Sequence, residues 1–393
     1  MDRGDTSVDQ PMNQPQPDVP VSTKRVARVS HLDGLRALAA LWVVLGHMSQ
    51  TAGRPIAGFF GAGMVQHILD RSDYAVGIFI TLSGYVLMLP VLKAGGWFRD
   101  GVLGFYKRRV WRILPPYYAV VLVSMLLIST VFTDHIGKMA GSIDYTWKDV
   151  VSHFLMVHNF YHPFKINYPL WTIAIEFQIY LLFPIYLLLR KRIGMLSAAC
   201  LVMVFSIGLR LVCPLSGSDV LAYRPEYIGL FVWGSVAAEI VRGTPVETPF
   251  ITNIKKGAIY LVVVLGIVSY TVDHRFHELT ASGILADYMG PALLIYLGLN
   301  HNILRRVLSL RLFTWIGEWS YSLYMVHALV LQAVYLWFIS ILGVSEGLPL
   351  FWNLLVFGLP IILFFCWVFF MLVERWFLPN KMPKFGRSTR IAA

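Results

Sequence analysis

Charge is what this sequence most conspicuously lacks. Only 14% of its 393 residues are Asp, Glu, Lys or Arg, whereas a soluble domain carries about 25%. Hydrophobic residues make up 57% of the chain. A chain of this length with so few charges must bury most of its surface in lipid. The composition therefore excludes a set of soluble domains and predicts an all-α polytopic membrane protein.

Cysteine is equally scarce. The three cysteines, Cys200, Cys213 and Cys366, lie in or beside apolar runs, and no CxxC pair occurs. This pattern suggests neither a disulfide framework nor a zinc site. We expect no metal cofactor.

The two ends of the chain differ from its middle. Residues 1–30 are polar and rich in Pro, Gln and Asp, which predicts a disordered cytosolic tail. They lack the layout of a cleavable signal peptide, so the first apolar run would act as an internal anchor. We expect a membrane domain over residues 31–376 and a basic cytosolic tail over 377–393.

Apolar runs divide the middle of the chain. A helix needs about 20 mostly apolar residues to cross a bilayer, and about ten transmembrane helices are predicted on this basis. They lie near residues 33–52, 75–92, 117–133, 171–190, 194–212, 226–242, 257–272, 283–300, 313–340 and 350–373.

The positive charges test this map. The net charge is +11, a value that would often indicate nucleic-acid binding. If the N-terminus is inside and each span changes the side, 25 of the 33 Lys and Arg residues fall on the inner side. This asymmetry follows the positive-inside rule with both termini cytosolic. It explains the basicity without nucleic acid. We expect the protein to lie in the plasma membrane, which would be the bacterial inner membrane.

The first span, HLDGLRALAALWVVLGH, carries ionisable residues that are costly in a bilayer. Arg36 and His47 are 11 residues apart, so they lie on one helix face about 16 Å apart along the axis. Asp33 precedes Arg36 by three residues and can pair with it. The alternative is that Asp33 and Arg36 extend to the interface and that His47 is a packing residue.

A second basic element, FYKRRVWRILPPYY at 105–118, contains Arg109 and Arg112 on one helical face. Guanidinium groups bind phosphates in a bidentate manner, although these charges could also serve only topology. Together with the first span, they suggest an anionic cofactor whose phosphates lie at the inner arginines and whose long arm reaches His47. Coenzyme A has this shape, and a histidine is a suitable general base for an alcohol.

At this point the chain resembles the acyltransferase 3 family. The matching segments, in family order, are HLDGLRALAALWVVLGH, IFITLSGYVL at 78–87, RRVWRILPPYY at 108–118, PLWTIAIEFQIYLLFP at 169–184 and WIGEWSYSLYMVHALVL at 315–331. Three positions depart from the family pattern. Phe177 stands where many relatives have a second Glu, Gly77 replaces an Asp, and Thr172 replaces a Ser.

The resemblance implies transfer of an acyl group, often acetyl, from cytosolic acyl-CoA to a hydroxyl of a cell-surface or lipid-linked glycan. Acetyl-CoA is the expected donor. His47 would be the general base, and Glu176 would orient its imidazole. Arg36 would orient the donor or stabilise charge on the thioester oxygen. We expect a stand-alone form without the hydrolase-like domain that some relatives carry.

Donor binding is predicted for Arg36, Arg108, Arg109 and Arg112. Acceptor binding is predicted for Asn159, Tyr168, Trp171 and Tyr321. Trp171 and Tyr321 belong to segments that resemble the family. The loop at 134–170, which contains Asn159 and Tyr168, is dense in aromatic rings that suit a carbohydrate face, although they could also form an interfacial aromatic belt. The interpretation includes membrane lipids as partners, admits a homo-oligomer and excludes nucleic acid.

Two other functions remain open from the sequence. A transporter or flippase of a glycan or lipid precursor could use Glu239 and Asp287 as a proton relay, although no internal repeat supports it. A scaffold or sensor in an envelope-synthesis complex would make the Arg36–His47 alignment incidental.

Overall fold

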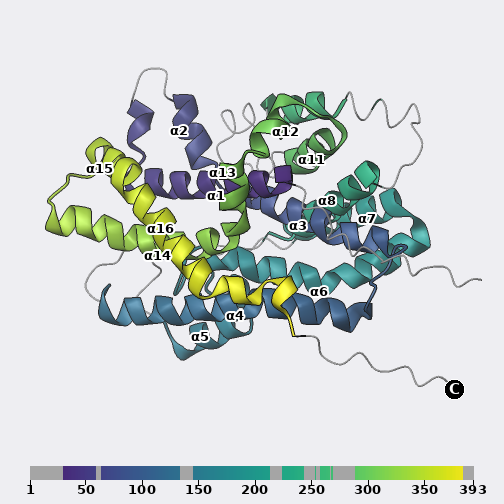
Figure 1. The fold of residues 1–393 in the computed structure, drawn as a ribbon, viewed down its shortest axis with the longest axis horizontal. Coiled ribbons are helices and arrows are strands. Elements are labelled where there is room, and N and C mark those ends of the chain that lie inside the picture. The colour runs from purple at the N-terminus through teal and green to yellow at the C-terminus, as the bar shows by residue number, and fades with distance from the viewer. Residues whose placement is uncertain are drawn as a thin grey trace, which may run out of the picture.

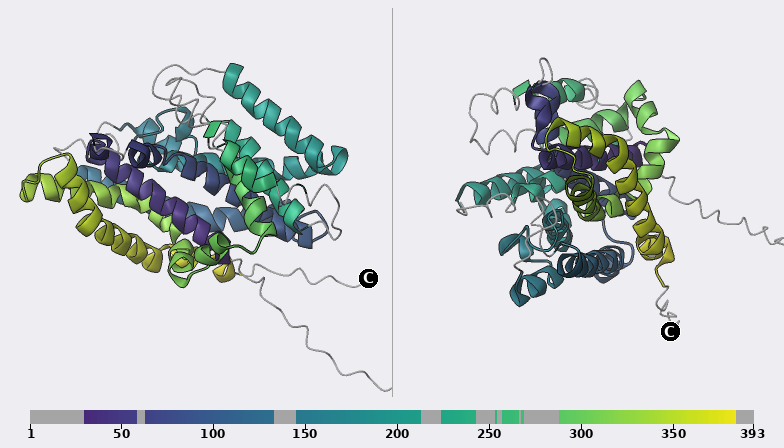
Figure 2. Two further views of the ribbon diagram at one scale, coloured as in Figure 1. Left: turned by 90° about the horizontal axis from the view of Figure 1, so that it is seen from above. Right: turned by 90° about the vertical axis from the view of Figure 1, so that its left-hand side faces the viewer.

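The computed structural model describes residues 30–58, 63–132, 145–212, 224–242, 253, 257–265, 267–268 and 288–383, and no strand occurs in these ranges. Most of the long helices run roughly along one axis, the horizontal axis of Figure 1. The two views of Figure 2 show them gathered into one bundle. Within the described ranges, the predicted all-α fold is confirmed.

The bundle is built from helices contributed along the whole described chain. They are α1 (Ser30–Thr51), α2 (Gly63–Asp70), α3 (Tyr74–Lys93), α4 (Gly101–Thr130), α5 (Trp147–Phe154), α6 (Leu170–Ile193), α7 (Met195–Val212), α8 (Glu226–Arg242), α11 (Met289–Leu299), α12 (Ile303–Leu308), α13 (Arg311–Glu318), α14 (Ser320–Leu336), α15 (Leu348–Asn353) and α16 (Leu359–Leu372). Short 3₁₀ turns follow at Glu374–Phe377 (η6) and Pro379–Lys381 (η7).

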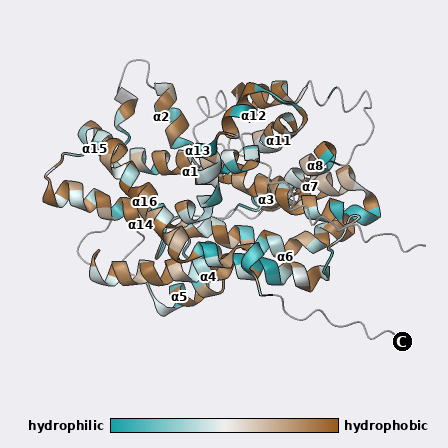
Figure 3. Ribbon diagram, in the orientation of Figure 1, coloured by the Kyte–Doolittle hydropathy of each residue, from teal (hydrophilic) through white to brown (hydrophobic). Residues whose placement is uncertain are grey.

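Five of the described helical segments are long and apolar enough to cross a membrane. They are Tyr74–Lys93, Gly101–Thr130, Leu170–Ile193, Ser320–Ile341 and Leu348–Leu372. Met195–Arg210 and Met289–Leu299 are apolar but shorter. Hydrophobic colouring predominates over the long helices in Figure 3. Ten spans and cytosolic termini remain predictions, and residues 269–287, which complete one expected span and begin the next, lie outside the described residues.

The run at 313–340, predicted as one span, is two helices. The chain turns at Trp319 between α13 and α14, and Ser320 Oγ donates a hydrogen bond to the carbonyl of Gly317. A Cβ built on Gly317 would lie 2.0 Å from the carbonyl oxygen of Asp33. The missing side chain lets α13 cross α1 backbone to backbone, so the apolar span begins only at α14.

The packing of α3 against α8 depends on glycine in the same way. A Cβ on Gly84 would lie 1.9 Å from the carbonyl oxygen of Phe231, and one on Gly234 would lie 2.1 Å from that of Thr81. Small residues at such crossings allow membrane helices to approach closely. The crossing also carries a hydrogen bond from Ser235 Oγ to the Gly84 carbonyl, at 3.2 Å.

Replacing Gly84 with alanine is therefore expected to destabilise the folded protein by about 1–3 kcal/mol, because backbone atoms must move apart. A matched control is Gly208→Ala in α7, where the added Cβ would meet no atom within 4 Å. The control should be neutral or gain up to about 1 kcal/mol from helix propensity. Thermal unfolding in detergent measures both, and equal melting temperatures for the two variants would contradict the expectation.

Candidate active site

A cavity of about 490 Å³ lies among α1, α3, α4, α6, α13 and α14. Its charged lining consists of Asp33, Arg36, Lys93, Arg109, Arg112, Glu176 and Glu318. Apolar and aromatic side chains, among them Phe79, Ile80, Ile113 and Tyr324, line the rest. An elongated ligand with an anionic end and an apolar arm suits such a lining.

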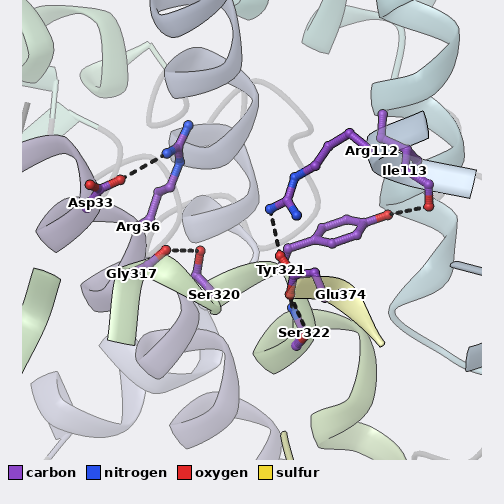
Figure 4. A network of polar contacts seen from close by, with 9 residues as sticks. All are labelled: Asp33, Arg36, Arg112, Ile113, Gly317, Ser320, Tyr321, Ser322 and Glu374. Carbon is purple, nitrogen blue, oxygen red and sulfur yellow. Dashed lines mark hydrogen bonds and ion pairs between the residues drawn. The ribbon is translucent and has the colours of Figure 1, made fainter. Parts of the chain in front are cut away.

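Arg36 enters this cavity from the first turns of α1. Its Nη1 donates to Asp33 Oδ1 at 3.2 Å, as Figure 4 shows. The predicted pairing of Asp33 with Arg36 is confirmed. His47 lies about 16 Å further along the helix, and it is not among the described residues that line the cavity. Arg36 is thus too far from His47 to contact a carbonyl that reacts there, which favours donor binding over the stabilisation of thioester charge.

Arg109 and Arg112, the two arginines of RRVWR that line the cavity, differ in their charged partners. Arg112 Nη2 lies 2.6 Å from Glu374 Oε1, and its guanidinium carbon is 5.5 Å from the ring centroid of Tyr321. Arg109 lies near the rings of Phe105 and Tyr180, each with its centroid 5.9 Å from the guanidinium carbon. Among the described residues Arg109 has no carboxylate partner within ion-pair distance, and its Nε is buried without a hydrogen bond. Of the two, Arg109 is therefore the cation that is not engaged in a direct ion pair with a described residue.

Arg108, also predicted to bind the donor, lies elsewhere. It pairs with Asp100 at 2.6 Å, both side chains are partly exposed, and neither lines the cavity. Arg108 precedes Arg109 by one residue, a rotation of about 100° around the helix, so the two side chains point in different directions. The structure gives no support to a donor-binding role for Arg108.

Glu176 also differs from its prediction. Its Oε1 accepts hydrogen bonds from Ser83 Oγ at 2.5 Å and from the hydroxyl of Tyr180. All three side chains line the cavity. The described hydrogen bonds of Glu176 thus run to α3 and α6, and the predicted pairing of Glu176 with His47 is replaced.

The partner of His47 is another histidine. His47 Nδ1 lies 2.9 Å from His327 Nε2, and His327 Nδ1 lies 2.9 Å from the carbonyl oxygen of Leu323. A carbonyl oxygen only accepts, so Nδ1 of His327 carries hydrogen and its Nε2 accepts. His47 Nδ1 must then donate, which leaves His47 Nε2 as an unprotonated acceptor. The WIGEWSYSLYMVHALVL segment contained His327, but nothing in its spacing connected it to His47.

A thin layer of side chains lies between the cavity and the two histidines. Tyr324 lines the cavity and its ring centroid is 6.0 Å from that of His327. Phe79 meets Tyr324 edge to face at 5.7 Å, and Thr172 Oγ1 donates to the Tyr324 hydroxyl at 2.8 Å. The cavity and the imidazoles are therefore neighbours separated by this layer.

The residues predicted to bind the acceptor are distributed over the site. Tyr168 meets His47 edge to face, with ring centroids 5.5 Å apart, and Tyr321 lines the cavity. Trp171 is buried, and Asn159 is engaged with Gln178 at 2.8 Å. The structure thus brings Tyr168 to the imidazole of His47 and Tyr321 to the cavity, but it places neither Trp171 nor Asn159 at the cavity.

The loop that carries Tyr168 is conformationally strained. Ile166 is fully buried with a φ of 64°, a value that is a genuine outlier for a β-branched residue. Next to it, Asn167 Nδ2 donates to the carbonyl of Met325 at 3.1 Å. Such strain persists only where the surroundings over-determine it, and here it fixes Tyr168 beside His47.

Three histidines, His153, His158 and His162, gather beside this loop. His153 and His158 stack at 3.9 Å, and burial lowers the pKa of both imidazoles, so they are neutral near pH 7. His162 Nδ1 pairs with Asp149 at 2.6 Å. Among the described residues, no group of three or more His, Cys, Asp or Glu side chains is arranged to hold a metal ion.

Comparison with known proteins adds to this geometry. The chain is 28% identical over 335 residues to the acyltransferase MdmB of Streptomyces mycarofaciens, a match covering 78% of this chain and 80% of the relative. It is 24% identical to the peptidoglycan O-acetyltransferase OatA of Listeria monocytogenes and 26% identical to the putative peptidoglycan O-acetyltransferase YrhL of Bacillus subtilis. These matches cover 78% and 83% of this chain, but only 50% and 51% of the two relatives.

No solved structure matches the chain significantly. The model of the acyltransferase domain of the acyltransferase 3 family matches residues 29–371. This stretch contains the Arg36–His47 helix, the RRVWR turn and the helix of His327. The protein therefore belongs to the acyltransferase 3 family and is an acyltransferase.

Proposed function

We propose that this acyltransferase moves an acyl group, expected to be acetyl, from acyl-CoA to a hydroxyl of a cell-surface or lipid-linked glycan, with His47 as general base. The observation that carries the proposal is the hydrogen-bonded pair of His47 and His327. The pair leaves one imidazole nitrogen, His47 Nε2, ready to accept a proton. Hydrogen bonding that fixes the tautomer of a base is the logic of catalytic triads.

The reaction balances with one proton. His47 Nε2 takes the proton of the acceptor hydroxyl as its oxygen attacks the thioester carbonyl carbon. The carbon–sulfur bond then breaks, and the departing sulfur receives the proton back from His47. His327 stabilises the transient imidazolium because its Nε2 accepts from His47 Nδ1 throughout.

The donor would lie in the cavity. Arg109 offers a guanidinium group there that is in no direct ion pair with a described residue, and Arg112 and Arg36 offer guanidinium groups that are already oriented by carboxylates. Guanidinium groups suit phosphates. The arm would extend between Phe79 and Tyr324 toward His47, so a shift of this layer is required for reaction.

Two observations favour a glycan as the acceptor: the names of two relatives, and the contact of Tyr168 with His47. Two relatives are named peptidoglycan O-acetyltransferases, one of them as putative, which favours a glycan hydroxyl. Tyr168 next to His47 offers an aromatic face for a sugar ring. We place the enzyme in the plasma membrane with both termini cytosolic, which puts the cationic cavity on the side where acyl-CoA is made.

One of the two residues considered for a transporter or flippase is bound in an ion pair. Glu239, considered as part of a proton relay, is held by Arg190 through two hydrogen bonds of 2.8 and 2.6 Å. Asp287 lies outside the described residues.

A direct assay separates these functions. Purified protein in detergent, given acetyl-CoA and peptidoglycan fragments or a lipid-linked sugar, is expected to release free CoA thiol and to add one acetyl group to the acceptor. Thiol titration and mass spectrometry measure the two products. If none of these acceptors causes thiol release, the proposal of an acyl-CoA-dependent glycan acyltransferase is contradicted.

A further inference from the structure

The chain that follows the last described span returns to the cavity. In η6, the ring centroid of Phe377 lies 5.2 Å from that of Trp111 in α4. The next two residues, Leu378 and Pro379, line the cavity. This returning segment, residues 374–381, lies beyond residue 371, where the family match ends. It nevertheless forms part of the cavity wall.

Glu374 fixes the start of the returning segment. Its carboxylate is 0% exposed and accepts hydrogen bonds from the backbone N–H of Ser322, at 3.0 Å, and from the Ser322 hydroxyl. Its other oxygen lies 2.6 Å from Arg112 Nη2. Figure 4 shows Arg112 reaching from α4 to this carboxylate beside the ring of Tyr321.

One nitrogen of the Arg112 guanidinium makes no hydrogen bond to a described residue. Arg112 Nη2 is held at Glu374, whereas Nη1 is buried without a hydrogen bond among the described residues. Arg112 also lines the cavity. If Glu374 did not hold it, Arg112 would be drawn to Glu176, a carboxylate that lines the same cavity.

We propose that Glu374 is a positioning residue for the acyl donor: it holds Arg112 and the returning segment in the places where they contact the bound donor. This inference rests on the proposed function, in which the cavity binds acyl-CoA. Glu374 would act through Arg112 and would not touch the reacting atoms.

The sign of the change in affinity distinguishes this role from others. Glu374→Gln is expected to raise the Kd for CoA and the KM for acetyl-CoA about tenfold or more, with kcat changed less than about threefold. Removing negative charge beside an anion site would by itself tighten binding, so a lower Kd would show a purely electrostatic role and overturn the proposal. An unchanged Kd with a lower melting temperature would show a merely structural role and also overturn it.

Two further variants make the test sharp. Glu239→Gln removes a carboxylate from the comparable Arg190 pair, and neither residue lines the cavity; its Kd for CoA should stay at the wild-type value. Ser322→Ala keeps the Glu374 charge but removes one of its hydrogen bonds, and a rise of about threefold in Kd is expected. It serves as the readout if Glu374→Gln does not fold.

Isothermal titration of the detergent-purified full chain with CoA gives the Kd values. If the wild type binds CoA and both Glu374→Gln and Ser322→Ala bind it equally well, the positioning role fails and the proposed function stands. If the wild type binds no CoA, the proposed donor fails and this proposal falls with it.

Discussion

Replacing His47 with glutamine is expected to reduce acyl transfer by about 10²–10⁴-fold, the contribution of a positioned general base. Glutamine can still hydrogen-bond to His327, so the fold and the donor affinity should be preserved. The measurement is the acceptor-dependent rate of thiol release, together with the Kd for CoA and the melting temperature. A folded His47→Gln protein with more than roughly a tenth of wild-type kcat would remove His47 from the role of base.

His327 provides the control for this prediction, because its proposed role is to fix the tautomer of His47. In His327→Gln, the amide oxygen can still accept from His47 Nδ1, and the loss of kcat should stay within roughly tenfold. In His327→Leu, no acceptor remains, and the loss should reach roughly 10²-fold or more. If both variants lost activity equally, the tautomer argument would fail even if His47 were essential.

Replacing Arg109 with glutamine is expected to weaken donor binding and to stabilise the protein. A hydrogen bond to a charged group contributes about 1.5–3 kcal/mol, so the Kd for CoA should rise about 10–100-fold. Without ligand, however, Arg109 is a cation with no carboxylate partner in ion-pair range among the described residues, and its Nε is buried without a hydrogen bond. Since a buried hydrogen-bond donor without an acceptor is destabilising, replacing this side chain should raise the melting temperature of the free protein.

Arg108→Gln is the matched control for the Arg109 variant. It removes the same charge from the adjacent position, but Arg108 pairs with Asp100 outside the cavity lining. Its effect on the Kd for CoA should be less than about twofold, since surface ion pairs contribute little. Equal losses in both variants would indicate that the basic turn attracts the donor only through its overall charge. Titration with CoA and thermal unfolding give the two required numbers.

Local patterns made part of the site predictable. Asp33 and Arg36 pair because residues three apart on a helix are neighbours, and this spacing is visible in the sequence. Arg109 and Arg112 share a face for the same reason, and both line the cavity. Arg108 was assigned with them from charge alone, and the helical turn directs it elsewhere.

Contacts between distant segments were not predictable in this way. The partner of His47 is 280 positions away in α14, and no single-sequence pattern relates the two. Glu176 was paired with His47 because a base usually has a carboxylate partner, but the packing of α3 and α6 gives it Ser83 and Tyr180 instead. In the sequence, Glu374 is a polar residue just after the last span, with nothing to indicate burial. It is buried because the chain turns back toward the cavity at this point.

The sequence contains a weak signal that the run at 313–340 forms two helices and not one. Glu318 and Ser320 interrupt its apolar pattern, which is unusual in the middle of a span. What the pattern could not show is that Gly317 meets the backbone of α1. Such close crossings of two helix backbones depend on a glycine, and a single glycine changes the hydropathy of a segment very little.

The layer formed by Phe79, Thr172 and Tyr324 has a consequence for fidelity. A thioester held next to an active base would be hydrolysed by any water that reached it, and each such event would waste a donor molecule. Here Tyr324 of this layer lines the cavity and neighbours His327, the partner of His47, and neither histidine lines the cavity among the described residues. With the donor and the base as proposed, the enzyme would remain loaded with donor while no acceptor is present, because the base and the thioester would meet only when the layer moves.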